Sequence, residues 1–338
     1  MTGYRCALFL STIVAASTFV TAQSTQSGAN DAPVSIYSLV PSPQQPEPAP
    51  PAVRSPAPAA QEGADPAGLV HLSVTVTDDK GKPITNLTKA DFVVLEDGQA
   101  REIATFVGPR PGELTTPMGL GIVMDISAGQ DRITSMRTPV EDLLKKLGKD
   151  SEFYFMEFST LPTLVTPWTT DHEAIVTAIR RVRGKEGRAL HDAILDALPV
   201  SAKGTRQKRV MLVLTAGADS HSKANRPRLM EGTRAADVMV YTVIADGEES
   251  LSGRDTGALR QAAGELREVT NPTGGRTIHA RGFDELETAI ADLGKEFAAQ
   301  YEISFPRGAA KDGKYHQIRV GARGQNLTIR HRAGYIAN

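Results

Sequence analysis

The chain has 338 residues, with 38 Lys and Arg against 39 Asp and Glu, and a formal net charge of −1. This balance gives no electrostatic basis for nucleic acid or an anionic membrane surface as the main partner. A hydrophobic content of 40% can supply a core, which excludes a chain that is disordered throughout.

Residues 1–22 have the features of a secretory signal peptide. Arg5 precedes an apolar run over residues 7–20, and Val20-Thr21-Ala22 forms a small-residue cleavage pattern. A membrane anchor is the alternative, but the run is short for a span of about 20 residues. We therefore expect a secreted or periplasmic protein with no transmembrane segment in the mature chain. The single cysteine, Cys6, lies in this signal, so no disulfide, cysteine metal site or cysteine nucleophile is expected.

Residues 23–68 are rich in proline and alanine. Ten of the 21 prolines lie between Pro33 and Pro66. Such a composition cannot bury a core and favours extended polyproline geometry. We expect a disordered linker that acts as a semi-rigid spacer.

Residues 69–108 read as a small unit of β-strands. The segment "LVHLSVTVTD" alternates apolar and polar residues, and Asp79 to Pro83 supply a turn. The segment "ADFVVLEDGQAREIATF" predicts two more strands around an Asp97-Gly98 hairpin. Three strands are too few to be stable alone.

Residues 115–299 alternate unbroken apolar strands with helices, which predicts a doubly wound, mostly parallel α/β sheet covered on both faces. The expected strands are 119–125, 152–158, 163–168, 209–215, 238–244 and 276–280, and the expected helices are 130–148, 171–182, 189–200, 226–236, 256–268 and 283–299.

Residues 300–338 return to a period of two, in "YEISFP", "YHQIRVGAR" and "LTIRHRAGYI". These three strands also need a partner. We expect them to pair with residues 69–108 in one small β-sandwich that flanks the α/β domain. The alternative is that each group extends the edge of the central sheet.

Ligands of doubly wound sheets bind at the carboxyl ends of the strands, so the loops at that edge decide the function. Strand 119–125 ends in Asp125-Ile126-Ser127, helix 189–200 starts in "GRALHDAI", and "VMLVLTAGAD" surrounds strand 209–215. In these three segments the chain resembles the von Willebrand factor A domain. The flanking segments "VTVTDDKGKPITNLTKADFVVLEDG" and "YEISF…DGKYHQIRV…RAGYI" are similar to those of a bacterial, acidobacterial-type subgroup with such a domain. The resemblance covers residues 69–336.

That family typically binds Mg²⁺ or Mn²⁺ at a metal-ion-dependent adhesion site, built from Asp-x-Ser-x-Ser, a threonine and a second aspartate. The resemblance assigns Asp125 and Ser127 to the first two positions. Gly129, Arg188 and Ala216 stand at the other three, and none of them offers a side-chain oxygen. A hard divalent ion needs oxygen ligands, and Arg188 would add a repulsive charge. We therefore expect a degenerate site with no metal; any Mg²⁺ or Mn²⁺ would rest on Asp125 and Ser127.

The same positions predict an ion pair. Asp125 in a partly buried cleft needs a counter-charge, and the Arg188 guanidinium can take the vacated place of the ion. The alternative is that Arg188 points to solvent while Asp125 binds backbone amides.

Other polar residues of this rim have structural interpretations. Asp131 and Asp219 can either replace the lost ligands or cap helices. Asp192 suits the positive end of a helix dipole. The three histidines of the rim match no zinc motif; they are His172, His191 and His221.

The sequence contains no Gly-x-Ser-x-Gly elbow, His-Glu-x-x-His motif, Walker loop or Gly-x-Gly-x-x-Gly after a strand. We therefore predict an exported, non-enzymatic, adhesion-type module that binds a protein partner through this rim without metal. The alternatives are a metal-dependent adhesion module that recruits Asp131 or Asp219, and an envelope hydrolase. The sequence identifies neither the partner nor the oligomeric state.

Overall fold

A computed structural model describes residues 68–110, 116–247, 256–308 and 311–337. The expected signal peptide, and the expected linker up to residue 67, lie outside these ranges. Within them, no helix combines the length and the apolar character needed to cross a membrane.

The central sheet, as far as the chain is described, has six strands in the order β10-β9-β8-β5-β6-β7, and of these only the edge strand β7 runs antiparallel to its neighbour. The strands are β5 (Met118–Asp125), β6 (Glu152–Phe158), β7 (Pro162–Thr169), β8 (Lys208–Thr215), β9 (Met239–Asp246) and β10 (Thr277–Arg281). All residues of β5 and β9 are buried, as expected for strands covered on both faces. The direction of winding reverses between β5 and β8, which places a topological switch point beside Asp125.

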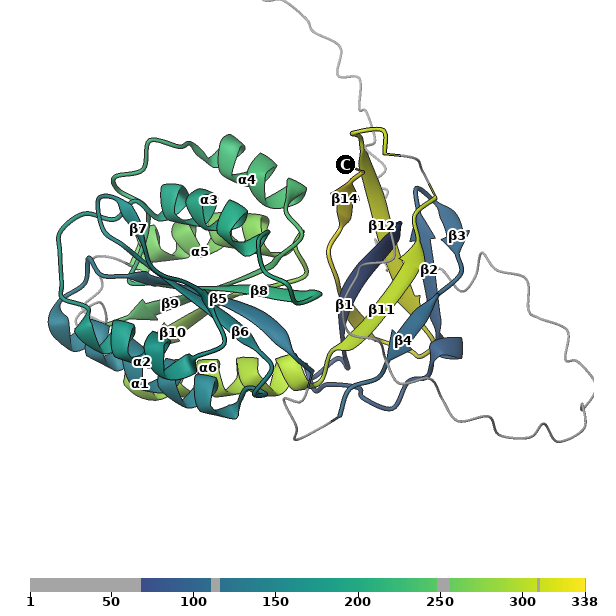
Figure 1. Ribbon diagram of the computed structural model, residues 1–338, viewed down its shortest axis with the longest axis horizontal. Coiled ribbons are helices and arrows are strands. Elements are labelled where there is room, and N and C mark those ends of the chain that lie inside the picture. The colour runs from purple at the N-terminus through teal and green to yellow at the C-terminus, as the bar shows by residue number, and fades with distance from the viewer. Residues whose placement is uncertain (1–67, 111–115, 248–255, 309–310, 338) are drawn as a thin grey trace, which may run out of the picture. The chain divides into compact units, whose positions relative to one another are not determined.

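Helices cover both faces of this sheet (Figure 1). Each face has its own apolar core, one of them with α1, α2 and α6 and the other with α3, α4 and α5. The helices are α1 (Gln130–Lys146), α2 (His172–Arg181), α3 (Leu190–Ser201), α4 (Arg226–Ala235), α5 (Thr256–Thr270) and α6 (Gly282–Ala298). The predicted doubly wound α/β class is confirmed.

The remaining described strands form two four-stranded sheets around a third core, in the orders β13-β1-β11-β4 and β14-β12-β2-β3. Their bounds are β1 (Leu69–Thr77), β2 (Phe92–Glu96), β3 (Gln99–Arg101), β4 (Thr105–Val107), β11 (Tyr301–Pro306), β12 (Tyr315–Ala322), β13 (Thr328–Arg330) and β14 (Gly334–Ile336). N-terminal β1 pairs with C-terminal β11, and β2 pairs with β12. The predicted sandwich of N- and C-terminal strands is thus confirmed, and neither group extends the central sheet.

Two predicted strands are each divided in the structure. The strand after the Asp97-Gly98 hairpin splits into β3 and β4, which belong to different sheets. Ile103 lies between them with its side chain in the sandwich core, so the chain crosses from one sheet to the other there. The last predicted strand likewise splits into β13 and β14, because the backbone N–H of Ala333 donates to Pro272 instead of continuing a ladder. Periodicity alone does not show where a strand changes sheets.

Candidate functional site

The switch point brings together the three loops singled out by the sequence. Asp125 ends β5 and Thr215 ends the neighbouring β8. The loop before α3 is bound to the same edge, since Lys185 N–H donates to Ile126 O at 2.8 Å and Ala189 N–H donates to Ser159 O at 2.6 Å. This loop therefore carries Arg188 toward Asp125.

Asp125 is fully buried, and both its carboxylate oxygens accept hydrogen bonds. Oδ1 accepts the Ser127 N–H at 2.8 Å. Oδ2 accepts the Ala216 N–H at 2.9 Å and the Thr215 hydroxyl at 3.1 Å. These donors are all neutral, so the negative charge of the carboxylate still needs a counter-charge.

Arg188 provides it, with its Nε 2.6 Å from Asp125 Oδ2. The predicted ion pair is therefore present, together with the backbone amides of the alternative. Nη1 of the same guanidinium donates to Ala218 O at 3.2 Å. A guanidinium has five N–H donors, and the described residues provide no acceptor for those on Nη2. Because the Arg188 side chain is 21% exposed, these donors can reach solvent or a ligand.

Two glycines shape the backbone near this arginine, one directly before it in the chain and one against its guanidinium. Gly187 has a φ of +82°, a left-handed conformation that favours glycine, and a Cβ there would overlap the Thr160 methyl group. A Cβ at Gly217 would lie 3.0 Å from Arg188 Nη1. Gly187 thus lets the loop turn against Thr160, and Gly217 leaves space for the guanidinium. Neither glycine, nor Thr215, was singled out by the sequence.

The other predicted rim residues contribute little side-chain chemistry. Gly129 is the N-cap of α1 and provides no side-chain cap. Ala216 contributes only its backbone N–H. The Ser127 hydroxyl oxygen is buried and has no hydrogen-bond partner among the described residues. The rim therefore presents one guanidinium, one hydroxyl and an uncapped helix start.

This donor set does not fit Mg²⁺ or Mn²⁺. A divalent ion would need Asp125 and several further oxygen ligands, but Asp125 Oδ2 is already bound by a guanidinium nitrogen. Arg188 would lie beside the ion and repel it. Within the described residues, no group of three or more His, Cys, Asp or Glu is placed to hold a metal.

The rim acids that the sequence offered as alternative metal ligands make other contacts. Asp219 accepts hydrogen bonds from the His191 N–H, in the first turn of α3, and from the Ser222 hydroxyl. Asp192 accepts the backbone N–H groups of Lys223 and Ala224, so it joins the start of α3 to the loop after β8. Asp131 lies exposed in the first turn of α1.

The rim histidines likewise serve the local backbone or neighbouring side chains. His221 Nδ1 accepts the Arg188 N–H at 3.4 Å, and His191 Nδ1 lies 3.3 Å from Ala224 O. His172 Nε2 lies 3.4 Å from a Glu173 carboxylate oxygen.

A cleft of about 640 Å³ opens beside the ion pair; its lining includes Ser127, Gly129, Arg132, Arg188, Asp246 and Phe283. Asp246 ends β9 as Asp125 ends β5, and its side chain is 7% exposed. Its Oδ2 lies 3.3 Å from His279 Nε2, while its Oδ1 has no partner among the described residues. Phe283, in the first turn of α6, is 44% exposed. The sequence did contain a signal for Asp246, because an acidic residue at the end of an apolar strand is the same pattern that identified Asp125.

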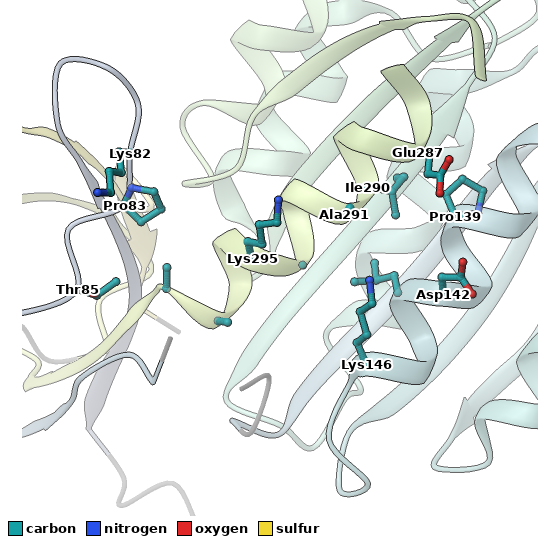
Figure 2. A pocket seen from close by; sticks show the side chains of 14 residues that line it. Lys82, Pro83, Thr85, Pro139, Asp142, Lys146, Glu287, Ile290, Ala291 and Lys295 are labelled. Carbon is teal, nitrogen blue, oxygen red and sulfur yellow. The ribbon is translucent and has the colours of Figure 1, made fainter. Parts of the chain in front are cut away.

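A second cavity of about 640 Å³ lies between α1, α6 and the turn after β1 (Figure 2). Pro139 and Ile290 belong to its apolar lining, and Lys82, Lys146 and Lys295 also line it. Among the described residues, this lining contains no hydrogen-bonded set of acid, base and nucleophile, and nothing in the structure indicates what covers it. The cleft at the switch point is therefore the better candidate.

No protein-family model and no curated protein matches this chain. Solved structures match at low sequence identity. A von Willebrand factor type A protein from Catenulispora acidiphila is 10% identical in sequence, with a TM-score of 0.46. The match covers 82% of this chain and 76% of that protein's chain. BatB from Bacteroides thetaiotaomicron is 17% identical, with a TM-score of 0.43, and the match covers 54% of this chain and 97% of the BatB chain.

The vWF domain of the type V pili tip protein Mfa5 from Porphyromonas gingivalis is 11% identical, with a TM-score of 0.44, covering 54% of this chain and 95% of its own. Within the described residues, the central sheet of this chain has five parallel strands and one antiparallel edge strand, and the Asp125 loop lies at its switch point. This is the doubly wound arrangement that the sequence resemblance to the von Willebrand factor A domain implies. The α/β domain, residues 116–299 as far as the structure describes them, is called the A-type domain below, after the sequence resemblance.

Proposed function

We propose that the chain is an exported, non-enzymatic module whose A-type domain binds a protein partner through the cleft beside Arg188, without a bridging metal. The observation that carries the proposal is the ion pair between Asp125 and Arg188. The Arg188 side chain supplies a positive charge at the carboxyl ends of the parallel strands, where a divalent ion would otherwise supply it. Export rests on the signal-like features of residues 1–22.

Metal independence is tested by calorimetric titration of the purified protein with Mg²⁺ and Mn²⁺. We expect no saturable binding to the unaltered chain. The double variant Arg188→Thr/Ala216→Asp removes the repulsive charge and restores two oxygen ligands, so it should gain measurable affinity. The matched control Arg181→Thr/Ala216→Asp keeps Arg188 and should remain without affinity. Saturable binding to the unaltered chain would refute metal independence.

The protein-binding role is tested by capture from envelope extracts with immobilised full-length protein, in the presence and absence of chelator. We expect a defined partner to be retained equally with chelator, and to be lost when Phe283 is changed to Ser. The matched control is Tyr315→Ser, because Tyr315 is an equally exposed aromatic residue that lies on β12, outside the cleft. Loss of capture with chelator would favour a metal-dependent module. Turnover of esters, peptides or glycans that disappears with Asp125→Asn would refute the non-enzymatic assignment.

A further inference from the structure

The outward side of the Asp125–Arg188 pair is cationic. Asp125 is fully buried and accepts four hydrogen bonds, so its oxygens do not line the cleft, although its charge offsets that of Arg188. The guanidinium lines the cleft, with the Nη2 donors still unused by the described residues. A planar fork of N–H groups is suited to a carboxylate, which can accept two parallel hydrogen bonds.

Two further features of the cleft favour an anionic group. Helix α1 has its N-cap at Gly129 and α6 at Arg281, both without a side-chain cap, so their first N–H groups are not used by capping side chains. The buried Ser127 hydroxyl, unpartnered in the described structure, can donate one more hydrogen bond. These donors add to the hydrogen bonds that the Arg188 guanidinium can offer to an anionic group.

The acidic residues of the cleft limit the negative charge that a bound ligand group can carry. Asp246 and Asp131 both line it, and Asp246 has His279 as a basic neighbour. Arg132 packs against Gly247, the residue after Asp246. Two arginines, Arg132 and Arg188, stand against Asp131, Asp246 and the buried Asp125 that pairs with Arg188, so the cleft has no positive excess. Attraction then comes from directional hydrogen bonds at Arg188, which suits a single carboxylate better than a doubly charged phosphate group.

Two exposed apolar side chains lie on segments near Arg188, one in the cleft lining and one in a turn that is hydrogen-bonded to the Arg188 loop. Phe283 lines the same cleft. Leu161, 63% exposed, lies in the turn after β6, and Ser159 of that turn accepts the N–H of Ala189, the residue after Arg188. Aromatic residues and arginine are enriched in protein–protein interfaces, and an apolar neighbour adds contact area.

From these observations we propose that Arg188 receives an acidic side chain of the partner directly, and that Phe283 and Leu161 contact apolar residues beside that acid. The inference rests on the proposed function, since it names the chemistry of the partner at the same cleft. Arg188 then acts as the binding residue, and Asp125, through Arg188, as a positioning residue.

The test uses ¹⁵N-labelled full-length protein titrated with 3-phenylpropionate and, separately, with its neutral analogue 3-phenylpropionamide. We expect the acid to shift the Arg188 Nε–H signal and the backbone amides of residues 127–131. The acid should bind about tenfold more tightly than the amide, because charge-assisted hydrogen bonds are replaced by neutral ones. Equal affinities, or no response of the Nε–H signal, would overturn the proposal.

Variants separate the contributions. Asp125→Asn/Arg188→Met removes both charges together and leaves no buried carboxylate unpaired, and it should abolish the preference for the acid. Arg181→Met removes an exposed arginine of α2 and should leave that preference unchanged. Phe283→Ser should weaken acid and amide alike. A preference that survives in the double variant would overturn the proposal, and the Nε–H signal of the unaltered protein decides the matter should that variant not fold.

The two proposals fail in distinguishable ways. If extract capture depends on Phe283 while the acid and the amide bind equally, only the carboxylate inference is wrong. If the acid is preferred through Arg188 but no captured protein depends on the cleft, the carboxylate site stands and the protein-binding function is wrong.

Discussion

Two buried carboxylates of this protein pair with arginines at different places. One place opens onto the cleft described above, and the other joins two parts of the fold. Asp125 at the switch point meets one guanidinium, which keeps unused donors beside a cleft in the described structure. Glu296 on α6 meets two, with Arg330 Nη2 2.6 Å from Oε1 and Arg276 Nε 2.8 Å from Oε2. Tyr241 also donates to Oε1 at 2.8 Å, and burial, followed by the Glu296 charge, raises the Tyr241 pKa.

The difference separates a binding group from a structural one. Arg330 belongs to β13 and Glu296 to α6, so this cluster joins a sandwich strand to the A-type domain. Gln300 extends it by donating to the Tyr241 hydroxyl at 3.0 Å and to Thr75 Oγ1 at 3.1 Å. Both Glu296 oxygens are bound from within the chain. An arginine at a buried acid is therefore evidence of a ligand site only where it also lines a cleft, as Arg188 does.

Arg188→Met should give the largest loss of stability. It leaves Asp125 fully buried and charged, with three neutral hydrogen-bond donors but no counter-charge. We expect the free energy of unfolding in urea to fall by about 3–4 kcal/mol. Asp125→Asn/Arg188→Met should recover most of this loss, because no buried charge remains. An unchanged urea midpoint in Arg188→Met would contradict the ion pair.

Glu296→Gln should cost less, about 2 kcal/mol in the same measurement. Arg276 and Arg330 lose their counter-charge, but their side chains are 35% and 23% exposed and can be hydrated. The matched control is Glu287→Gln, an exposed residue of the same helix, which should change stability by less than about 0.5 kcal/mol. Binding of 3-phenylpropionate should persist in Glu296→Gln, and its loss would place this cluster in the binding machinery.

The sequence was sufficient for the fold because the strands of the A-type domain are continuous apolar runs. The order of motifs along the chain was also sufficient to bring Asp125, Ser127, Gly129, Arg188 and Ala216 to one edge. Apart from Asp246, which ends an apolar strand, the missed residues carry no pattern of their own. Thr215 and Gly217 belong to the rim only because β8 lies beside β5. Phe283 and Asp246 enter the cleft because the start of α6 and the end of β9 meet the start of α1 there.

Gly187→Ala tests how closely the backbone is built around Arg188. It combines a left-handed φ of +82° with an overlap against Thr160, and we expect a loss of about 2 kcal/mol with weaker acid binding. Gly81→Ala is the matched control, since its φ is +76° and a Cβ there meets nothing within 4 Å. It should cost about 1 kcal/mol and leave acid binding intact. Equal losses in both variants would show that the close approach to Thr160 adds nothing.

The smallest effect concerns a histidine of the sandwich whose acidic partners reach solvent. His316 Nδ1 lies 2.7 Å from Asp97 Oδ2, and its Nε2 lies 3.1 Å from Asp312 Oδ1. The hydrogen bonds to Asp97 and then Asp312 raise the His316 pKa above its ordinary 6.5. The hydrogen bond from His316, and then that from the Gln317 N–H, lowers the pKa of Asp97.

The direction of the pH effect follows from these shifts. A raised histidine pKa contributes stability that is complete below pH 6.5 and is lost as the pH rises through the raised value. A lowered aspartate pKa contributes stability that is present above 3.8 and is lost as the pH falls through the lowered value. His316→Gln should therefore reduce the free energy of unfolding at pH 5.5 more than at pH 8.5. The difference should stay below about 1 kcal/mol, since the Asp97 side chain is 50% exposed and water screens the pair. Equal reductions at both pH values would mean that His316 contributes packing on Tyr335 rather than charge.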